Sequence, residues 1–425
     1  MPNALFKYRM DKYLRMNTEF EGMFYRFILL IVSLWLPTVG QAFYQWQDND
    51  KSVELRGLFR GFGLAANNPN DDVLFKKDKV LTGGIFGRLM LDAQLSSVSF
   101  EMHAVQSYID EKLRTGGSRF GSLMDVERSN ALHWRFAGDD ADLMIDRINM
   151  QIASDTIYFK LGRQPINLAT TFYFTPNDFF APFAAQTFYR TYKPGVDAAK
   201  LDLQLGELSQ LSLMAVAGYE ADYQNDTGWS DRPDWSETSY LARASTLLKT
   251  FEWAVLLGTV KNDEIIGVDF QGELFEWLGV RGEGHLRFPD ESGKSRDVKF
   301  SLGIDYRFEN TLTLRLEQFY QRSGSTDPDD YNFDDTNSFY LAQNYTALGG
   351  SYEFTPLLLG DVTWLFNHID SSNLLALYAT YSLSDEAELA MGANLPIGDQ
   401  PDNGTLESEF GSYPKSISIE YRLYF

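Results

Sequence analysis

Hydrophobic and polar residues alternate along most of the chain after residue 43. In residues 297–308, one parity holds the apolar side chains Val298, Phe300, Leu302, Ile304, Tyr306 and Phe308. The other parity holds Lys299, Ser301, Gly303, Asp305 and Arg307. Because side chains of a strand point alternately to its two faces, this spacing predicts a β-strand with one apolar face and one polar face.

Similar runs follow one another to the end of the chain without a helical repeat or a linker. The runs are 53–66, 83–95, 98–109, 143–154, 156–164, 195–205, 208–219, 238–248, 251–260, 264–275, 278–288, 297–308, 311–321, 346–354, 357–367, 373–382, 387–395 and 415–425. Most have the length that a tilted strand needs to cross a membrane. We therefore expect an all-β fold, a closed antiparallel transmembrane β-barrel of about 18 strands. Sixteen strands is the alternative, if 264–275 or 143–154 is divided wrongly.

The connections between these runs alternate between short and long. Residues 96–97, 206–207, 249–250 and 276–277 make tight turns, whereas 67–82, 110–142, 220–237, 322–345 and 396–414 are long and polar. Residues 261–263 and 368–372 are short where a long loop is due. Short periplasmic turns opposite long extracellular loops are typical of outer-membrane barrels.

The polar face of each strand is expected to line a water-filled lumen, because a charge facing lipid at mid-depth costs about 2–4 kcal/mol. By this parity we expect a wholly polar lumen. The candidate pore-lining residues are Arg56, Arg60, Arg88, Arg147, Lys200, Arg281, Glu283, Arg287, Lys299, Asp305, Arg307, Arg315, Glu317 and Arg422. They form either a salt-bridged lining or a basic ladder that orients a polar or anionic solute.

The loop at 167–194 is rich in aromatic residues and has few charges. An exposed apolar segment of this size would invite aggregation or association. We expect the loop to fold into the barrel and narrow the pore, as the third loop does in classical porins, which it resembles in position. The candidate constriction residues are Phe172, Tyr173, Phe174, Asp178, Phe179, Phe180, Phe183 and Arg190. A contact within a homo-oligomer is the alternative.

Composition supports an exported protein. The 425 residues include no cysteine, and the mean hydropathy of −0.28 disfavours a bundle of membrane helices. The net charge of −22 disfavours a nucleic-acid partner. Residues 1–42 read as a signal peptide cut after Ala42, with Met23 as an alternative start, and 43–425 as one barrel domain. The residues show no catalytic, metal or cofactor motif, so we expect neither an enzyme nor a cofactor.

The final run, Ser416 to Phe425, ends as an amphipathic strand on an aromatic residue. It resembles the C-terminal signature of Gram-negative outer-membrane β-barrels. This implies that Tyr421, Leu423 and Phe425 are read by the barrel-assembly machinery, and that outer-membrane lipid and lipopolysaccharide surround the protein. Residues 162–164, Arg190 and 195–197 are also similar to alginate-export porins.

The expected function is passive diffusion of small hydrophilic solutes across a bacterial outer membrane. One alternative is a barrel that sheathes a redox or secretion partner, which requires a wide lumen with no inward loop. The other is an enzyme that acts at the rim of the barrel.

Overall fold

The structure is a computed structural model that describes residues 44–75, 77–109, 134–137, 141–221, 229–290, 293–331 and 339–425. The expected signal peptide, residues 1–42, lies outside the described residues. Within the described part, no helix combines the length and the apolar character needed to cross a membrane. The barrel belongs to a single compact unit, Ala42–Phe425.

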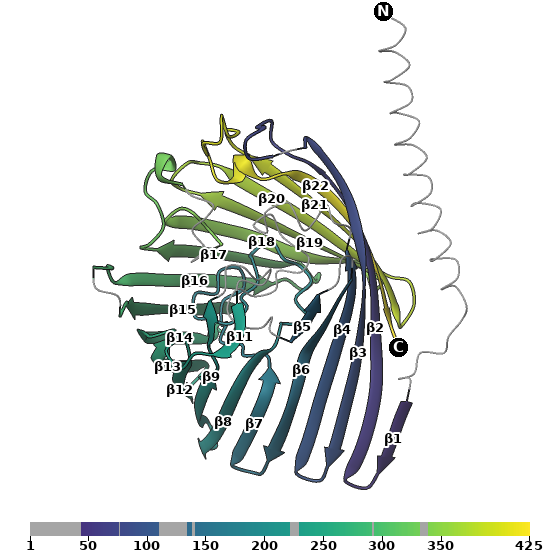
Figure 1. Cartoon of the computed structure of the whole chain (residues 1–425). Helices are drawn as coiled ribbons and strands as arrows, with labels where there is room; N and C mark the ends of the chain where they lie inside the picture. Colours follow the sequence, from purple (N-terminus) through teal and green to yellow (C-terminus); the bar gives the residue numbers. More distant parts are fainter. Residues whose placement is uncertain are drawn as a thin grey trace, which may run out of the picture. The chain divides into compact units, whose positions relative to one another are not determined.

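Eighteen strands form one closed antiparallel barrel (Figure 1). They are β2 Lys51–Asn67, β3 Lys79–Leu95, β4 Val98–Ile109, β6 Ala141–Ala153, β7 Ile157–Gln164, β8 Val196–Gly206, β9 Ser209–Val216, β12 Ser239–Leu248, β13 Phe251–Val260, β14 Asp263–Leu274, β15 Leu278–Phe288, β16 Asp297–Arg307, β17 Thr313–Gln321, β18 Asn344–Thr355, β19 Leu358–Asn367, β20 Asn373–Ser382, β21 Ala387–Ile397 and β22 Lys415–Tyr424. Each wall strand pairs with its neighbours in sequence, and β22 pairs with β2, which closes the sheet. The prediction of 18 strands is confirmed.

In the part of the chain that the structure describes, four short strands and two 3-10 turns lie outside this wall. The strand β1 Tyr44–Asp48 pairs with β2, and β5 Arg135–Ala137 pairs with β6. A separate hairpin joins β10 Tyr219–Ala221 to β11 Trp229–Pro233. The turns are η1 Pro328–Asp330 and η2 Phe410–Ser412.

The two ends of the barrel differ, as the sequence predicts. At the turn end, strands are joined by tight connections such as Ser96-Ser97 and Lys249-Thr250. At the loop end lie the long connections, among them residues 165–195, 217–238, 322–343 and 398–414. The two short exceptions at the loop end, 261–262 between β13 and β14 and 368–372 between β19 and β20, are also present.

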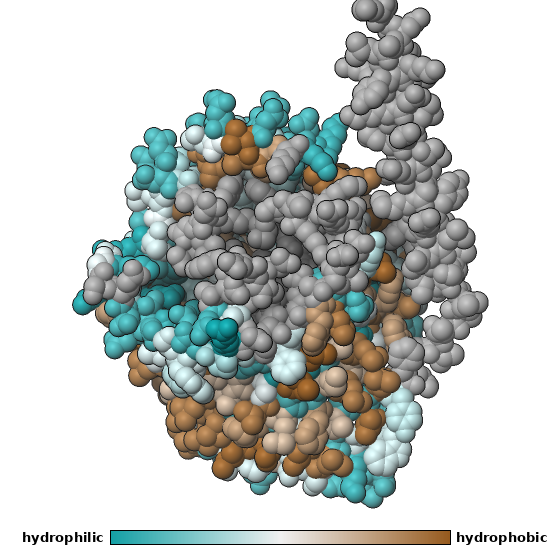
Figure 2. Space-filling view, viewed as in Figure 1, coloured by the Kyte–Doolittle hydropathy of each residue, from teal (hydrophilic) through white to brown (hydrophobic). Residues whose placement is uncertain are grey.

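The outer face carries a belt of exposed apolar side chains. In β16, Leu302 is 50 % exposed, whereas its neighbour Ser301 is fully buried. In β13, Leu257 is 49 % exposed and Leu256 is buried. Hydrophobic side chains gather in Figure 2 over β6 to β9, and hydrophilic ones at the ends of β15 to β17. Such alternation suits a wall with lipid on one side.

The closure of the barrel depends on a glycine. The amide of Phe425 donates to the carbonyl of Gly57 at 3.0 Å, beside the β2–β22 pairing. A Cβ atom on Gly57 would lie 2.1 Å from the ring of Phe425. The absent side chain of Gly57 therefore makes room for this ring against β2.

We expect Gly57→Val to weaken the closure. The added side chain must displace the Phe425 ring, and overpacking of this kind costs about 1–3 kcal/mol. The purified variant should lose its folded, fast-migrating electrophoretic band at a lower temperature than wild type. Gly87→Ala is the control, since a Cβ there meets nothing within 4 Å. Equal melting of the two variants would contradict this explanation of closure.

The lumen is not wholly polar, which corrects the expectation from parity. One inward cluster contains Ile166, Leu168, Phe180, Val196, Ala198, Met214, Val216, Leu241, Leu256, Val260 and Ile265. In this cluster Ile166, Leu168 and Phe180 belong to the loop between β7 and β8, and the other residues belong to wall strands. Alternation places the wall residues on the inner face, where the loop residues cover them. Apolar side chains are stable there because they pack on a loop and not against water.

Candidate pore constriction

The segment of residues 165–195, here called the inner loop, folds into the barrel. It leaves the wall at Gln164 and returns at Val196, which pair with each other across β7 and β8. Its side chains Ile166, Leu168 and Phe180 pack on the inward cluster of β8, β9 and β12 to β14. The loop therefore lies on the lumen face of the wall, where the sequence analysis expects it.

Two buried carboxylates hold the first half of the inner loop. Glu283 of β15 accepts hydrogen bonds from the backbone amides of Thr170, Thr171 and Asn177. A carboxylate surrounded by backbone N–H groups keeps its charge solvated by the protein instead of by water. Glu283 was expected to line the pore, but it is only 3 % exposed because the loop covers it.

Glu317 of β17 forms the second anchor. It accepts from the amide of Phe172 at 2.9 Å, from Tyr173 at 3.1 Å and from Phe174 at 2.6 Å. The hydroxyl of Ser301 donates to the same carboxylate at 2.9 Å. Glu317 is 1 % exposed, so it too lies beneath the loop and does not line the open lumen.

Phe172 is clamped between two of the expected pore arginines. The guanidinium carbon of Arg281 lies 3.7 Å from the ring centroid, and that of Arg315 lies 4.7 Å from it. Arg281 also donates to the carbonyl of Thr170 at 3.3 Å. These two cations stack on the loop, which gives them a structural role.

The second half of the inner loop runs along the opposite wall. Phe188 stacks on Tyr378 of β20, with ring centroids 5.0 Å apart. The guanidinium carbons of Arg422 and Arg60 lie 4.1 Å and 4.7 Å from the ring centroid of Tyr189. That of Arg88 lies 4.4 Å from the ring centroid of Tyr192. Successive contacts thus carry the loop from β8 past β17 to β22, β2 and β3, around the inside of the barrel.

The loop also holds itself together. The Arg190 guanidinium donates to the carbonyls of Phe172, Ala184 and Ala185, and its Nε donates to that of Thr187. Asp178 and Lys193 form a buried ion pair. Arg190 therefore fixes the shape of the loop. Phe183 in the same loop is partly buried.

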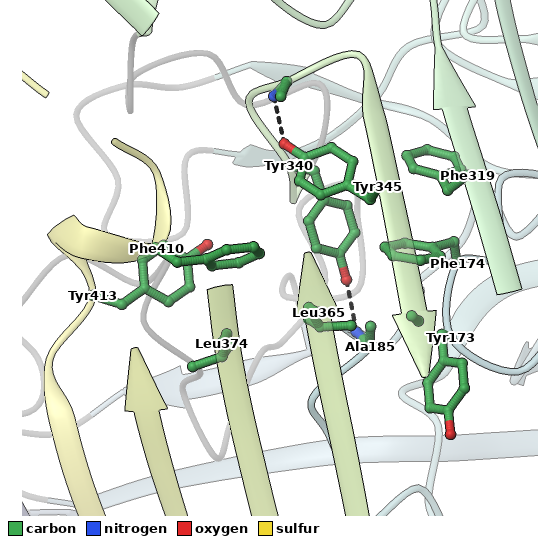
Figure 3. Close-up of a cluster of buried hydrophobic side chains, with 12 residues drawn as sticks. Tyr173, Phe174, Ala185, Phe319, Tyr340, Tyr345, Leu365, Leu374, Phe410 and Tyr413 are labelled. Carbon is green, nitrogen blue, oxygen red and sulfur yellow. Dashed lines mark hydrogen bonds between the residues drawn. The ribbon is translucent and has the colours of Figure 1, made fainter. Parts of the chain in front are cut away.

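Other loops fold inward as well, which the sequence analysis missed. Figure 3 shows one buried cluster that includes Phe174 of the inner loop, Tyr340 of the 322–343 connection and Phe410 of the 398–414 connection. Phe174 contacts Tyr340, and Phe410 contacts Tyr345 of β18. Dashed lines in Figure 3 mark the amide of Ala185 donating to the Tyr340 hydroxyl at 2.8 Å and that of Ala342 donating to Tyr345. Aromatic residues in otherwise polar loops were the available signal.

The other expected pore cations are mostly paired with carboxylates. Nitrogen–oxygen distances are 2.6 Å for Arg56–Asp92, 2.6 Å for Arg60–Glu420, 2.5 Å for Arg88–Asp146, 2.9 Å for Arg147–Glu101, 2.9 Å for Lys200–Asp202, 3.0 Å for Arg281–Asp305, 2.6 Å for Arg287–Asp263, 3.9 Å for Lys299–Asp297, 3.7 Å for Arg307–Glu353 and 3.1 Å for Arg422–Glu388. This pairing favours the salt-bridged lining over a ladder of available cations.

Asp92, Glu101 and His103 lie close enough to suggest a metal site. However, Arg88 faces the Nδ1 atom of His103 at 3.5 Å, so the proton of the ring belongs on Nε2, toward the two carboxylates. Arg56 and Lys160 bind the same carboxylates. The two carboxylates therefore have cationic side chains as partners, which accounts for their charge without a metal ion.

Arg163 shows how the backbone departs from simple parity. Alternation places it toward lipid, yet it is 1 % exposed and binds Asp197 at 3.1 Å. The preceding Gly162 has φ of +115°, and a Cβ there would lie 2.3 Å from the carbonyl oxygen of Ile148. The glycine conformation allows Arg163 to turn away from lipid while β7 continues to Gln164.

Among the described residues, cavities lie between the inner loop and the wall, and two of them are lined by the loop's first and second halves. The larger, about 440 Å³, lies between residues 188–191 and strands β18 to β22. The smaller, about 210 Å³, lies between residues 165–170 and β8, β9, β12 and β14. The larger cavity is the wider space that a solute could use.

Comparisons with known proteins agree with this architecture. Neither a protein-family model nor a curated protein sequence matches the chain. Among solved structures, OccAB3 of Acinetobacter baumannii is 12 % identical over 88 % of this chain and 99 % of its own, with a TM-score of 0.57. OccK2 (OpdF) of Pseudomonas aeruginosa is 11 % identical, over 88 % and 97 %, with a TM-score of 0.58.

A BenF-like porin from Pseudomonas fluorescens Pf-5 is 13 % identical over 88 % of this chain and 99 % of its own, with a TM-score of 0.56. At such identity the likeness concerns the fold. The chain has the closed 18-strand porin fold of the Occ channels.

Proposed function

We propose that this protein is an outer-membrane channel through which small hydrophilic solutes diffuse passively. The observation that carries the proposal is the inner loop, which Glu283 and Glu317 fasten to the lumen face and which leaves a cavity of about 440 Å³ beside it. A loop held in this way restricts the passage without closing it. The long loops then face outside and the turn end faces the periplasm.

A structural neighbour indicates the size of the solute. OccK2 (OpdF) of Pseudomonas aeruginosa has been solved in complex with glucuronate. A cavity of about 440 Å³ has room for a solute of this class, because ligand pockets commonly span about 300–1,000 Å³. We therefore propose a solute about as large as one sugar ring.

The alternative functions fit the structure less well. A sheath around a partner protein requires a lumen without an inward loop, whereas here the inner loop contacts wall strands from β8 round to β3. The same inward contacts leave the aromatic residues of this loop unable to mediate a contact within an oligomer. We also propose that residues 1–42 direct export as a signal peptide and that the barrel-assembly machinery recognises Phe425.

The test measures which solutes pass. Purified protein in planar bilayers should give stepwise conductance, and in liposomes it should admit arabinose and glucose much faster than the trisaccharide raffinose. The absence of conductance steps would contradict a channel. Equal rates for glucose and raffinose would contradict a constriction and would favour a wide sheath.

A further inference from the structure

The larger cavity carries an excess of negative charge. Three carboxylates line it, those of Glu353, Asp361 and Glu388, together with one guanidinium, that of Arg422. This guanidinium is already bound by Glu388 at 3.1 Å and by Glu420. An anionic solute would therefore meet more carboxylates than available cations in this part of the lumen.

Asp361 of β19 differs from the other two carboxylates. A carboxylate oxygen of Glu353 lies 3.7 Å from a guanidinium nitrogen of Arg307, and Glu388 is bound by Arg422. Among the described residues, the Asp361 carboxylate has no hydrogen bond and no cationic nitrogen within 4 Å. It is partly buried, so water screens its charge less than that of an exposed residue.

A neighbouring cation, Arg315, is held by other groups. Arg315 of β17 lies two strands from Asp361, beyond ion-pair distance. Its guanidinium stacks on Phe172 and contacts the hydroxyl of Ser351 at 3.5 Å, on the strand between them. Asp361 is therefore left as a carboxylate that a mobile cation in the cavity can reach.

Aromatic rings adjoin Asp361 in the cavity lining, because Tyr378 pairs with it across β19 and β20. Phe188 of the inner loop and Tyr378 of β20 are stacked with an interplanar angle of 7°, and Tyr189 and Tyr424 lie beside them. Aromatic faces attract organic cations and also pack against sugar or alkyl groups. A carboxylate next to aromatic rings suits a solute that carries a charged amine on a small carbon frame.

We propose that this cavity selects small organic cations, with Asp361 as the residue that receives the charged amine. The proposal rests on the channel function above and adds the charge of the solute. Glucosamine, glucose and glucuronate share a sugar frame and differ in charge, so they separate charge from size. At mildly acidic pH the amine of glucosamine is protonated.

The experiment measures how each sugar blocks the KCl current of single channels in planar bilayers. Glucosamine is expected to block wild type at a lower concentration than glucose, and glucuronate at a higher one. Asp361→Asn should raise the half-blocking concentration of glucosamine by about threefold, the effect of one partly screened charge pair. Asp361→Glu should retain most of the blocking, and Glu273→Gln, which removes an exposed lumen carboxylate outside the cavity, should leave it unchanged.

Stronger blocking by glucuronate than by glucosamine in wild type would overturn the proposal, even if no variant folds. So would an Asp361→Asn channel with wild-type blocking by glucosamine. In both cases the channel itself still conducts, so the proposed function stands. Wild-type protein without any current would contradict the proposed function instead.

Discussion

Excision of the inner loop is expected to raise single-channel conductance at least about twofold, because the wall alone encloses a water-filled lumen at this strand number. Gln164 and Val196 pair across β7 and β8, so a two-residue Asn-Gly turn after Pro165 can close the hairpin once residues 166–195 are removed. The wall pairings do not depend on the loop. Conductance in planar bilayers is the measurement.

A control separates loss of the constriction from general damage. The β15–β16 connection, residues 289–296, can be shortened in the same way. In this connection the backbone amide of Asp290 donates to Asp263 of β14, and Arg296 stacks on Phe288 of β15. This variant should conduct like wild type. If excision of the inner loop leaves conductance unchanged while both proteins fold, the loop does not limit the current.

The strands were predictable from sequence because lipid imposes a local rule. Every strand must present apolar side chains outward. Phe300, Leu302 and Ile304 therefore predict β16 without reference to the rest of the chain. The connections follow from the gaps between these runs. Even the irregular Arg163 could be noticed, because it breaks a parity that its neighbours obey.

The construction of the site was less predictable, because it depends on contacts distant in sequence. Parity correctly places Glu317 on the inner face but cannot show that Phe172 to Phe174, more than 140 residues earlier, cover it. The same limit applies to Arg281 and Arg315. A basic residue facing a lumen looks the same in sequence whether it meets water or an aromatic ring.

The inward connections other than the inner loop were missed for a related reason. Tyr340 and Phe410 are aromatic residues within loops that are otherwise polar and acidic, so the average composition concealed them. Their burial beside Phe174 shows that single aromatic residues in long loops carry more information than loop composition. The acidic composition of these loops still predicts a modest cation preference at low ionic strength, which fades as salt screens the mouth.

Glu317→Gln is expected to release the first half of the inner loop without altering the wall. Three backbone amides, those of Phe172, Tyr173 and Phe174, donate to this carboxylate. Glutamine has nearly the same shape, but its side chain offers a single acceptor oxygen and turns an N–H₂ donor toward the remaining amides. Leaving buried donors without acceptors costs about 1–3 kcal/mol each, so we expect a loss of about 3 kcal/mol in the free energy of unfolding.

The channel record should show this release as increased current noise in the open state, together with a modest rise in mean conductance. Glu283→Gln should have a similar effect, because Thr170, Thr171 and Asn177 donate to that carboxylate in the same manner. The two changes act on one segment, so the double variant should be less noisy than the sum of the single ones. Glu273→Gln removes a lumen carboxylate of equal charge that no described loop contacts. The open-state current noise of this variant should equal that of wild type. Equal noise in Glu317→Gln and Glu273→Gln would mean that lumen charge, and not the hold on the loop, governs the current.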